Sequence, residues 1–185
     1  MFLPLERLLS RSARPQTRED ELQTLRARFR AQPGPREAGP SAVESARRLR
    51  TLRVETSAAF NGVEACGSCA KGRPEPNGHW RGGHCCGGRT LDLFTPTEVA
   101  ALKLAGVRAK DLRAPAGDHA GCAFRDEQGC ALPPEHRPNI CVRFVCLELR
   151  AELREGESWR KVSVLAAALR DESARFERLM AGDAS

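Results

Sequence analysis

The sequence predicts a mainly α-helical protein with a small, irregular, cysteine-rich metal-binding core. Apolar residues recur at helical spacing both before and after the middle of the chain. All eight cysteines lie between residues 66 and 146, where Gly and Pro are frequent and no long strand pattern occurs. We therefore expect short hairpins in the core and little regular sheet, flanked by an N-terminal helical hairpin and a long C-terminal helix.

These changes in composition divide the chain into four segments. We assign residues 1–16 to an N-terminal arm and residues 17–62 to the helical hairpin. Residues 63–150 form the cysteine-cluster metal-binding domain, and residues 151–185 hold a C-terminal helix that packs on the core. Aromatic residues are few and tyrosine is absent, so a bound metal can supply stability that a larger core would otherwise provide.

The helical hairpin has two start signals. Thr17 and Ser41 are each followed three residues later by an acidic residue, which is the pattern of a capping box. The first helix should end at the Pro/Gly-rich residues 32–40, and the second should run to about Phe60. The expected apolar faces hold Leu22, Leu25 and Phe29 in the first helix, and Val43, Ala46, Leu49 and Leu52 in the second.

A third helix has the strongest start signal in the chain. Thr95 suits the capping position, Pro96 suits the first helical position, and Glu98 completes a capping box. We expect this helix to stop at Gly106. The short apolar run before it, residues 91–94, alternates partly but is too short to assign.

Residues 121–130 have the composition of a tight hairpin. Cys122 and Cys130 lie near its two ends, so both thiolates can face one site.

The last two cysteines predict a break in the helical pattern. Cys141 and Cys146 would differ by about 140° in direction on a regular helix, so one uninterrupted helix cannot aim both at one ion. We therefore predict a turn over residues 137–141 and a helix that begins near Val142. The apolar face expected for that helix comprises Ile140, Phe144, Leu147 and Ala151.

Residues 157–181 form the clearest helix of the sequence. Its apolar face should pack across the metal domain or the N-terminal helices, and Gly182 should end it. That face comprises Val162, Leu165, Leu169, Phe176 and Leu179.

The charge pattern bears on partners and location. The net charge is +6, but cations and anions are interleaved along the helices, which favours a solvated surface over a nucleic-acid site. Glu6 and Arg7 interrupt the apolar N-terminus before a secretory segment forms, and no apolar run is long enough for a membrane helix. We expect a cytoplasmic protein, in which clustered cysteines are metal ligands or redox groups more often than disulfides.

The thiols themselves predict a metal centre. Thiolate sulfur selects zinc, copper(I) and iron–sulfur clusters, and four thiolates complete either a zinc site or a cluster. Eight therefore permit two four-ligand sites, one multinuclear site, or one site with redox-active thiols beside it. The candidate metal ligands are Cys66, Cys69, Cys85, Cys86, Cys122, Cys130, Cys141 and Cys146.

Two local motifs bear on the kind of site. The Cys66-x-x-Cys69 turn lets two sulfurs converge on one metal, although alone it is also the pattern of a thioredoxin-like redox pair. The adjacent Cys85 and Cys86 point in different directions and can bind two metals, which favours iron–sulfur over a zinc ribbon. With eight thiols present, the histidines need not be ligands; His84, beside Cys85, is the strongest candidate among them.

The chain lacks the sequence motifs of several enzyme classes. The chain has no phosphate-binding loop of the G-x-x-x-x-G-K-[ST] type, no H-E-x-x-H zinc-protease motif and no G-x-S-x-G nucleophile elbow.

Residues 66–146 resemble the CxxCxxCC or YkgJ-type cysteine-cluster family. The matching order is Cys66-x-x-Cys69, Cys85-Cys86, a helix containing Glu98, Cys122, Gly129-Cys130, Arg137-Pro138-x-x-Cys141 and Phe144-x-Cys146. The family is described as zinc- or iron-chelating, so the resemblance implies a metal site. Fifteen residues, 70–84, separate Cys69 from the adjacent pair where the family has two, although a long loop can keep its ends close. A similar cluster accompanies flagellin lysine N-methylation in some bacteria, where it is regarded as an iron–sulfur site.

Three functions agree with these features. The first is a cytoplasmic metalloprotein that binds an iron–sulfur cluster or Zn²⁺ through cysteine thiolates. The second is a redox or protein-modification enzyme, or an accessory to one, and a substrate pocket beside the cysteines would favour it. The third is a zinc-stabilised module that binds protein or nucleic acid. The identity of the metal, the grouping of its ligands and the substrate or protein partner are open at this point.

Overall fold

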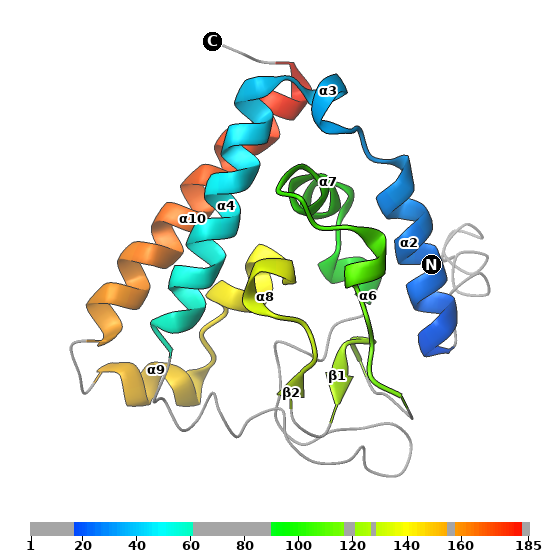
Figure 1. Ribbon diagram of the computed structural model, residues 1–185. Helices are drawn as coiled ribbons and strands as arrows, with labels where there is room; N and C mark the ends of the chain where they lie inside the picture. The colour runs from blue at the N-terminus through cyan, green and yellow to red at the C-terminus, as the bar shows by residue number, and fades with distance from the viewer. Residues whose placement is uncertain (1–16, 61–89, 117–120, 127–128, 155–157, 183–185) are drawn as a thin grey trace, which may run out of the picture.

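The computed structural model of the 185-residue chain describes residues 17–60, 90–116, 121–126, 129–154 and 158–182, and this part of the chain is mainly helical (Figure 1). None of its helices has the length and apolar character needed to span a bilayer. The helices are α2 (Arg18–Ala31), α3 (Pro35–Ala38), α4 (Pro40–Ala58), α6 (Thr90–Leu93), α7 (Pro96–Leu104), α8 (Asn139–Arg143), α9 (Leu147–Arg154) and α10 (Ser158–Ala181). Two 3₁₀ turns, η2 (Ala109–Asp111) and η3 (Pro134–His136), and two short strands, β1 (Arg125–Asp126) and β2 (Gly129–Cys130), complete the list.

Helix α7 lies at the centre of the fold. The predicted start is confirmed, because the Thr95 side chain accepts a hydrogen bond of 3.2 Å from the Glu98 N–H and Pro96 is the first helical residue. The predicted capping box is wrong, because the Glu98 carboxylate contacts Arg53 and Asn139 and not the Thr95 backbone. The predicted end is confirmed too, since Gly106 follows with φ +96°, a conformation that favours glycine. The helix is apolar and buried around most of its circumference, as expected for an element packed on several sides. Its buried residues are Val99, Ala100, Ala101, Leu102 and Leu104.

Two hydrophobic cores meet at α7. The first core joins α2, α6, α7 and the β1–β2 region, and the second joins α4, α7, α8 and α10. The first comprises Leu22, Leu25, Phe29, Phe94, Val99, Leu102, Val107, Leu112, Cys122, Ala123, Phe124 and Leu132. The second comprises Ala42, Ala46, Leu49, Leu52, Ala100, Ala101, Leu104, Ala105, Val142, Leu169 and Phe176.

Helices α4 and α10 pack side by side and run in opposite directions (Figure 1). This confirms the long C-terminal helix, and of the two packing partners considered it shows contact with an N-terminal helix, α4. Val162, Leu169 and Phe176 are buried, and Gly182 ends the helix with φ +85°. Inside this interface the Ser45 hydroxyl donates a hydrogen bond of 2.5 Å to the Glu172 carboxylate.

The N-terminal helices differ from the expected hairpin. Helix α2 packs on α6 and α7, whereas α4 packs on α10 and on another face of α7, so the two helices are not a packed pair. The Thr17 capping box is present, but Ser41 does not cap α4. Instead Gly39, with φ +78°, precedes Pro40 as the first helical residue. The Pro/Gly-rich connection contains α3 and therefore separates the helices instead of folding one onto the other.

The region of the last two cysteines also differs from expectation. The predicted break is present, but helix begins at Asn139, not near Val142, and α8 stops at Arg143. The chain is extended at Phe144, with φ −71° and ψ 124°, and helix resumes as α9. The predicted apolar face is wrong, because Phe144 is 40% and Leu147 is 80% exposed. The break rotates α9, so that its buried residues are Leu149 and Leu153.

The remaining expectations fall on short elements or on undescribed residues. Residues 90–93 form the helical turn α6, so the short apolar run is not a strand. Strands β1 and β2 pair antiparallel, Arg125 opposite Cys130 and Asp126 opposite Gly129, within the stretch expected to be a tight hairpin. The N-terminal arm, residues 1–16, lies outside the described residues.

Candidate metal centre

The predicted ligands divide into two halves. Cys66, Cys69, Cys85 and Cys86 lie outside the described residues, as do His79, His84 and His119. Cys122, Cys130, Cys141 and Cys146 are described, and they belong to the β1–β2 region, α8 and the start of α9. In Figure 1 the two strands and α9 lie at the end of the molecule away from α3, and α8 lies above them, nearer the middle of the fold.

Cys122 is a buried thiol at the edge of the first core. It is 6% exposed and precedes β1. Burial, followed by the neighbouring charges of Cys130 and Glu21, raises the pKa of Cys122 to about 12, although hydrogen bonds from Phe124 and Thr90 oppose the shift. Without a metal this sulfur therefore carries its proton at neutral pH, and a metal that binds it must displace that proton.

Thr90 fixes the surroundings of Cys122. Its hydroxyl accepts a hydrogen bond of 2.8 Å from the Ala123 N–H and donates to the carboxylate of Glu21, which α2 supplies. The same oxygen lies 3.9 Å from Cys122 Sγ. Thr90 is fully buried and is the first described residue after position 89. The chain therefore leaves the undescribed segment in direct contact with a predicted ligand.

Cys130 lies on β2, opposite Arg125 of β1. Its side chain is partly buried against the first core, and its charge acts on Cys122. Arg125 is 2% exposed, so a cationic residue is buried in the short sheet that carries Cys130. The short sheet thus carries Cys130, and Cys122 lies three residues before its first strand.

Cys146 occupies the capping position of α9. Its sulfur accepts a hydrogen bond of 3.5 Å from the Leu149 N–H, and its carbonyl accepts one of 2.9 Å from the Arg150 N–H. The thiol therefore does what a serine or aspartate side chain does at a helix start. Its side chain packs on a third core, formed by Ala59, Leu149, Leu153 and Val162. Phe60, the last described residue before position 61, packs on the same core.

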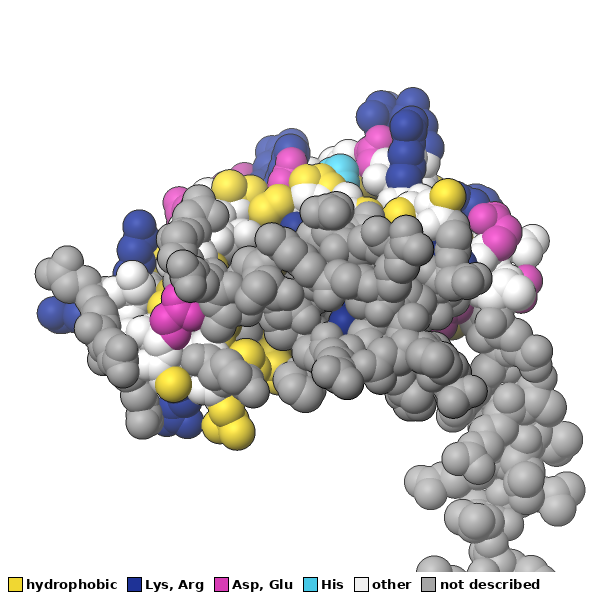
Figure 2. All heavy atoms as spheres, turned by 90° about the horizontal axis from the view of Figure 1, so that it is seen from below, with side chains coloured by type: hydrophobic (Ala, Val, Ile, Leu, Met, Phe, Trp, Pro, Cys, Tyr) yellow, Lys and Arg dark blue, Asp and Glu magenta, His cyan; other side chains and the backbone are white. Residues whose placement is uncertain are grey.

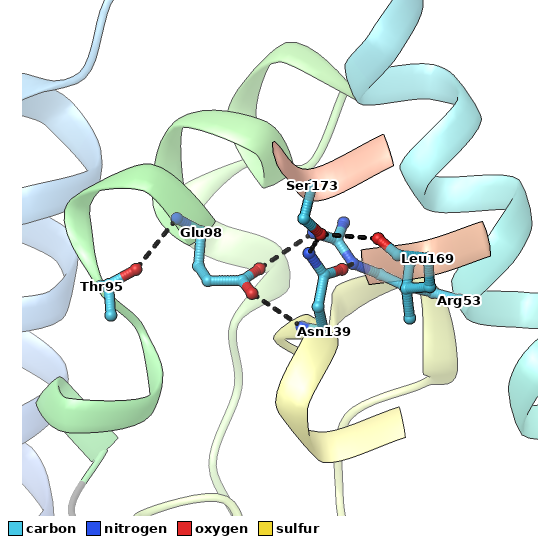
Figure 3. A network of polar contacts seen from close by, with 6 residues as sticks. All are labelled: Arg53, Thr95, Glu98, Asn139, Leu169 and Ser173. Atoms are coloured by element: carbon cyan, nitrogen blue, oxygen red, sulfur yellow. Dashed lines mark hydrogen bonds and ion pairs between the residues drawn. The ribbon is translucent and has the colours of Figure 1, made fainter. Parts of the chain in front are cut away.

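Cys141 belongs to α8, whose start is held by a buried polar network (Figure 3). Arg53 Nε donates to Asn139 Oδ1 at 2.7 Å, and an Arg53 terminal nitrogen contacts Glu98 Oε2 at 3.1 Å. The Asn139 N–H donates to the other Glu98 oxygen at 3.1 Å. Asn139 also donates to the Ser173 hydroxyl of α10 at 2.6 Å, and Ser173 donates to the Leu169 carbonyl. Four helices therefore meet at the residue that precedes Cys141 by two positions.

The network buries an ion pair. The Arg53 side chain is 0% exposed, and that of Glu98 is 17% exposed. Burial lowers the pKa of Arg53, an effect that the charge of Glu98 and that of Cys141 oppose. Burial also raises the pKa of Glu98, against the opposing charge of Arg53 and the Asn139 hydrogen bond. Both shifts have the direction expected when charges leave water.

Arg137 and Pro138, which precede Cys141, have a local role. Arg137 Nε donates a hydrogen bond of 2.7 Å to the Leu132 carbonyl, which closes the loop around η3. Pro138 then occupies the position before the first residue of α8. The two residues therefore shape the backbone that leads into Cys141.

A pocket of about 340 Å³ opens beside α8. Asn139, Ile140 and Arg143 of α8 line it, and the other lining residues include Glu98, Ser173 and Phe176. None of the four described cysteines is part of the lining. The pocket is large enough for a small ligand.

The hydrogen-bonded network of Arg53, Glu98, Asn139 and Ser173 was not predicted from the sequence, although the position of Arg53 on α4 indicates a buried polar partner. The buried positions of α4 are Ala42, Ser45, Ala46, Leu49, Leu52, Arg53 and Thr56. An arginine at helical spacing on that apolar face requires a buried partner. Glu98 was assigned to the helix cap, yet its carboxylate points from α7 toward Arg53 and Asn139 (Figure 3).

Within the described ranges, no group of three or more His, Cys, Asp or Glu side chains is close enough to hold a metal ion. Comparison of the chain with known protein families, with curated proteins and with solved structures finds no match.

Proposed function

We propose that the protein is a metalloprotein whose iron–sulfur cluster or Zn²⁺ is held by thiolates from both halves of the cysteine set. One observation carries the proposal. The two ends of the undescribed segment 61–89 lie at described cysteines: Thr90 contacts Cys122, and Phe60 packs on the core that holds Cys146. The described residues that flank this segment therefore lie beside two of the described cysteines, Cys122 and Cys146.

The covalent chain limits how far those cysteines can lie from the anchors. Cys86 precedes Thr90 by four residues, so their Cα atoms are at most roughly 14 Å apart. Cys66 follows Phe60 by six residues, which allows at most roughly 22 Å. These limits are compatible with one shared site or with two adjacent sites.

The described residues fit a thiolate-bound metal in their chemistry. Cys122 is a free thiol in a dry environment, which a soft metal can enter by replacing the proton. Buried cations, Arg53 and Arg125, lie near Cys141 and Cys130, and such charges offset the negative charge of several thiolates. A bound cluster would supply electron transfer, whereas bound zinc would supply rigidity.

A second candidate is a modification or redox enzyme that uses the same centre. The pocket beside α8 favours it, because three residues of the helix that carries Cys141 line that pocket, and the lining combines apolar with charged side chains. The third candidate, a nucleic-acid-binding module, finds less support. In Figure 2, basic and acidic side chains of the described residues are interspersed on the face that is shown.

The deciding experiment is purification without oxygen, followed by an absorption spectrum and by measurement of iron, acid-labile sulfide and zinc per chain. A brown protein with iron and sulfide, or a colourless one with stoichiometric zinc, supports the proposal. A protein that contains none of these and binds none after reconstitution overturns it. Cys141→Ser and Cys86→Ser should each lose metal and melt at lower temperature, and unchanged metal content in both variants would argue against shared ligation.

A further inference from the structure

The pocket of about 340 Å³ beside α8 is lined by residues of five helices, α4, α6, α7, α8 and α10. Small-molecule sites usually combine an apolar lining with a few polar groups that fix the orientation of the ligand. The polar groups of this pocket therefore indicate the chemistry of a ligand that fits it. The apolar lining residues are Leu49, Leu93, Ala101, Ile140 and Phe176.

Two of the polar lining residues can accept hydrogen bonds but cannot donate them. The Glu98 carboxylate accepts one bond from the Asn139 N–H and one from Arg53, each of 3.1 Å, and a carboxylate can accept about four (Figure 3). The Ser173 hydroxyl gives its one hydrogen to the Leu169 carbonyl at 2.8 Å. It accepts one bond, of 2.6 Å, from the Asn139 side chain, and a second lone pair is left. A ligand that contacts these two residues must supply the donors.

The charges of the lining point in the same direction. Asp92 of α6 and Glu177 of α10 add two exposed carboxylates, and neither forms an ion pair or a hydrogen bond within the described part of the chain. Among the described lining residues, Arg143 is the only cation. The charge of Glu98 is offset by Arg53. The two remaining carboxylates outnumber Arg143, so the lining carries a net negative charge.

We propose that this pocket binds a small organic cation that donates hydrogen bonds, namely a primary amine that carries an apolar group. The ammonium has three N–H donors for Glu98 and Ser173, and Asp92 and Glu177 attract its charge. The apolar group contacts the apolar part of the lining. The inference goes beyond the proposed metal centre and does not depend on it, because no described cysteine lines the pocket.

An anion or a neutral molecule of the same shape fits this lining less well. A carboxylate brings further acceptors to Glu98 and Ser173 and is repelled by the two unpaired carboxylates. A neutral alcohol keeps one donor but gains nothing from the net negative charge. The preference among three such ligands therefore separates a cation site from a general apolar pocket.

The test uses the full chain, kept reduced, in an NMR titration with benzylamine at neutral pH. Benzyl alcohol and benzoate have the same ring and are the comparison ligands. Each is added up to about 20 mM, well above the Kd expected of a ligand of this size that fits its site. We expect saturable binding of benzylamine, and binding of the other two that is at least tenfold weaker.

Two double variants separate the pocket from the general charge of the surface. Asp92→Asn/Glu177→Gln removes the two unpaired carboxylates and should bind benzylamine at least fivefold more weakly. Glu44→Gln/Asp171→Asn removes two exposed carboxylates outside the lining, so it makes the same change in net charge. This matched control should change the affinity less than twofold. Circular dichroism verifies that both variants keep the wild-type helical content.

Arg143→Gln gives a result of opposite sign. Removing the one cation of the described lining should leave benzylamine binding at least as tight as in the wild type. If Asp92→Asn/Glu177→Gln fails to fold, this variant decides, because weaker amine binding would contradict a cation site.

Three outcomes would overturn the inference: no saturable binding of benzylamine, equal binding of benzoate, or equal weakening in the two double variants. Each of them leaves the metalloprotein proposal standing, since the metal content of the same preparations is measured separately. Conversely, a protein that binds benzylamine as expected but holds no iron or zinc supports the pocket and overturns the metal centre.

Discussion

The hydroxyl of Thr90 accepts a hydrogen bond of 2.8 Å from the Ala123 N–H. It joins the start of α6 to the backbone beside Cys122, two places that are more than thirty residues apart in the chain. The same hydroxyl donates to Glu21 of α2. One small side chain therefore ties three segments together next to a predicted ligand.

Thr90→Val should destabilise the metal-free protein by about 2 kcal/mol. Valine keeps the shape but leaves the buried Ala123 N–H without its acceptor and removes one donor from Glu21. The measurement is urea unfolding followed by circular dichroism. Thr90→Ser keeps the hydroxyl and should cost less than half as much. Thr24→Val, on the exposed surface of α2, should change stability by no more than about 0.5 kcal/mol, and an equal loss there would refute the argument.

Two candidate helix caps should respond differently to the same substitution. Thr17 accepts a hydrogen bond of 3.1 Å from the Asp20 N–H, so Thr17→Ala should cost about 1 kcal/mol. Ser41 is exposed and lies inside α4, where Gly39 precedes the helix, so Ser41→Ala should be neutral within about 0.5 kcal/mol. Thermal unfolding of the two variants compares them directly, and a larger loss at Ser41 would restore it as the cap.

Thr17 and Ser41 show which features of the fold a local sequence pattern can predict. Caps, Pro at a first turn and Gly after a last turn depend on neighbouring residues, so α2, α7 and α10 could be predicted from the sequence. The packing of α2 and α4 could not be predicted from the sequence, because it depends on which face of α7 each helix contacts. The face of α9 was mispredicted for a related reason: one extended residue, Phe144, rotates everything that follows it.

Gly106→Ala should destabilise the protein by about 1 kcal/mol or more, because Gly106 has φ +96° and an alanine there is strained. Gly34→Ala is the matched control. Gly34 has φ −83°, and a Cβ there would meet only Glu37 Oε2, at 3.9 Å. We expect the control to lose at most about 0.5 kcal/mol in the same denaturant titration. Equal losses would show that glycine entropy, and not the left-handed conformation, decides the effect.

For the candidate site, the sequence predicts the type of ligand but not the residues that surround each cysteine. Eight clustered thiols indicate metal chemistry without any knowledge of the fold, because soft sulfur has few other uses at that density. These surrounding residues come from distant segments: Thr90 of α6 lies beside Cys122, and Arg53 of α4 donates a hydrogen bond to Asn139, in the helix that holds Cys141. Residues so far apart in the chain form no recognisable sequence motif, so these contacts could not be predicted from the sequence.

Cys122 should be the slowest of the four described cysteines to react with iodoacetamide in the metal-free, reduced protein. It is 6% exposed and its pKa is raised to about 12, so little thiolate is present at pH 8. Peptide mass spectrometry after timed quenching gives the rate at each site, and Cys130 on the paired strand is the internal reference.

The pH dependence of stability and of alkylation tests whether burial of the Cys122 thiol is the cause of its slow reaction. Because the folded pKa lies above the ordinary value of 9.0, folding favours the protonated thiol. This contribution to stability is fully present below pH 9 and is lost as the pH rises toward about 12. Cys122→Ala should therefore lose less stability than wild type between pH 9 and pH 10.5, measured by urea unfolding. An alkylation rate at Cys122 that levels off near pH 9, as for an exposed thiol, would contradict the buried environment and the proton release that metal binding at this sulfur requires.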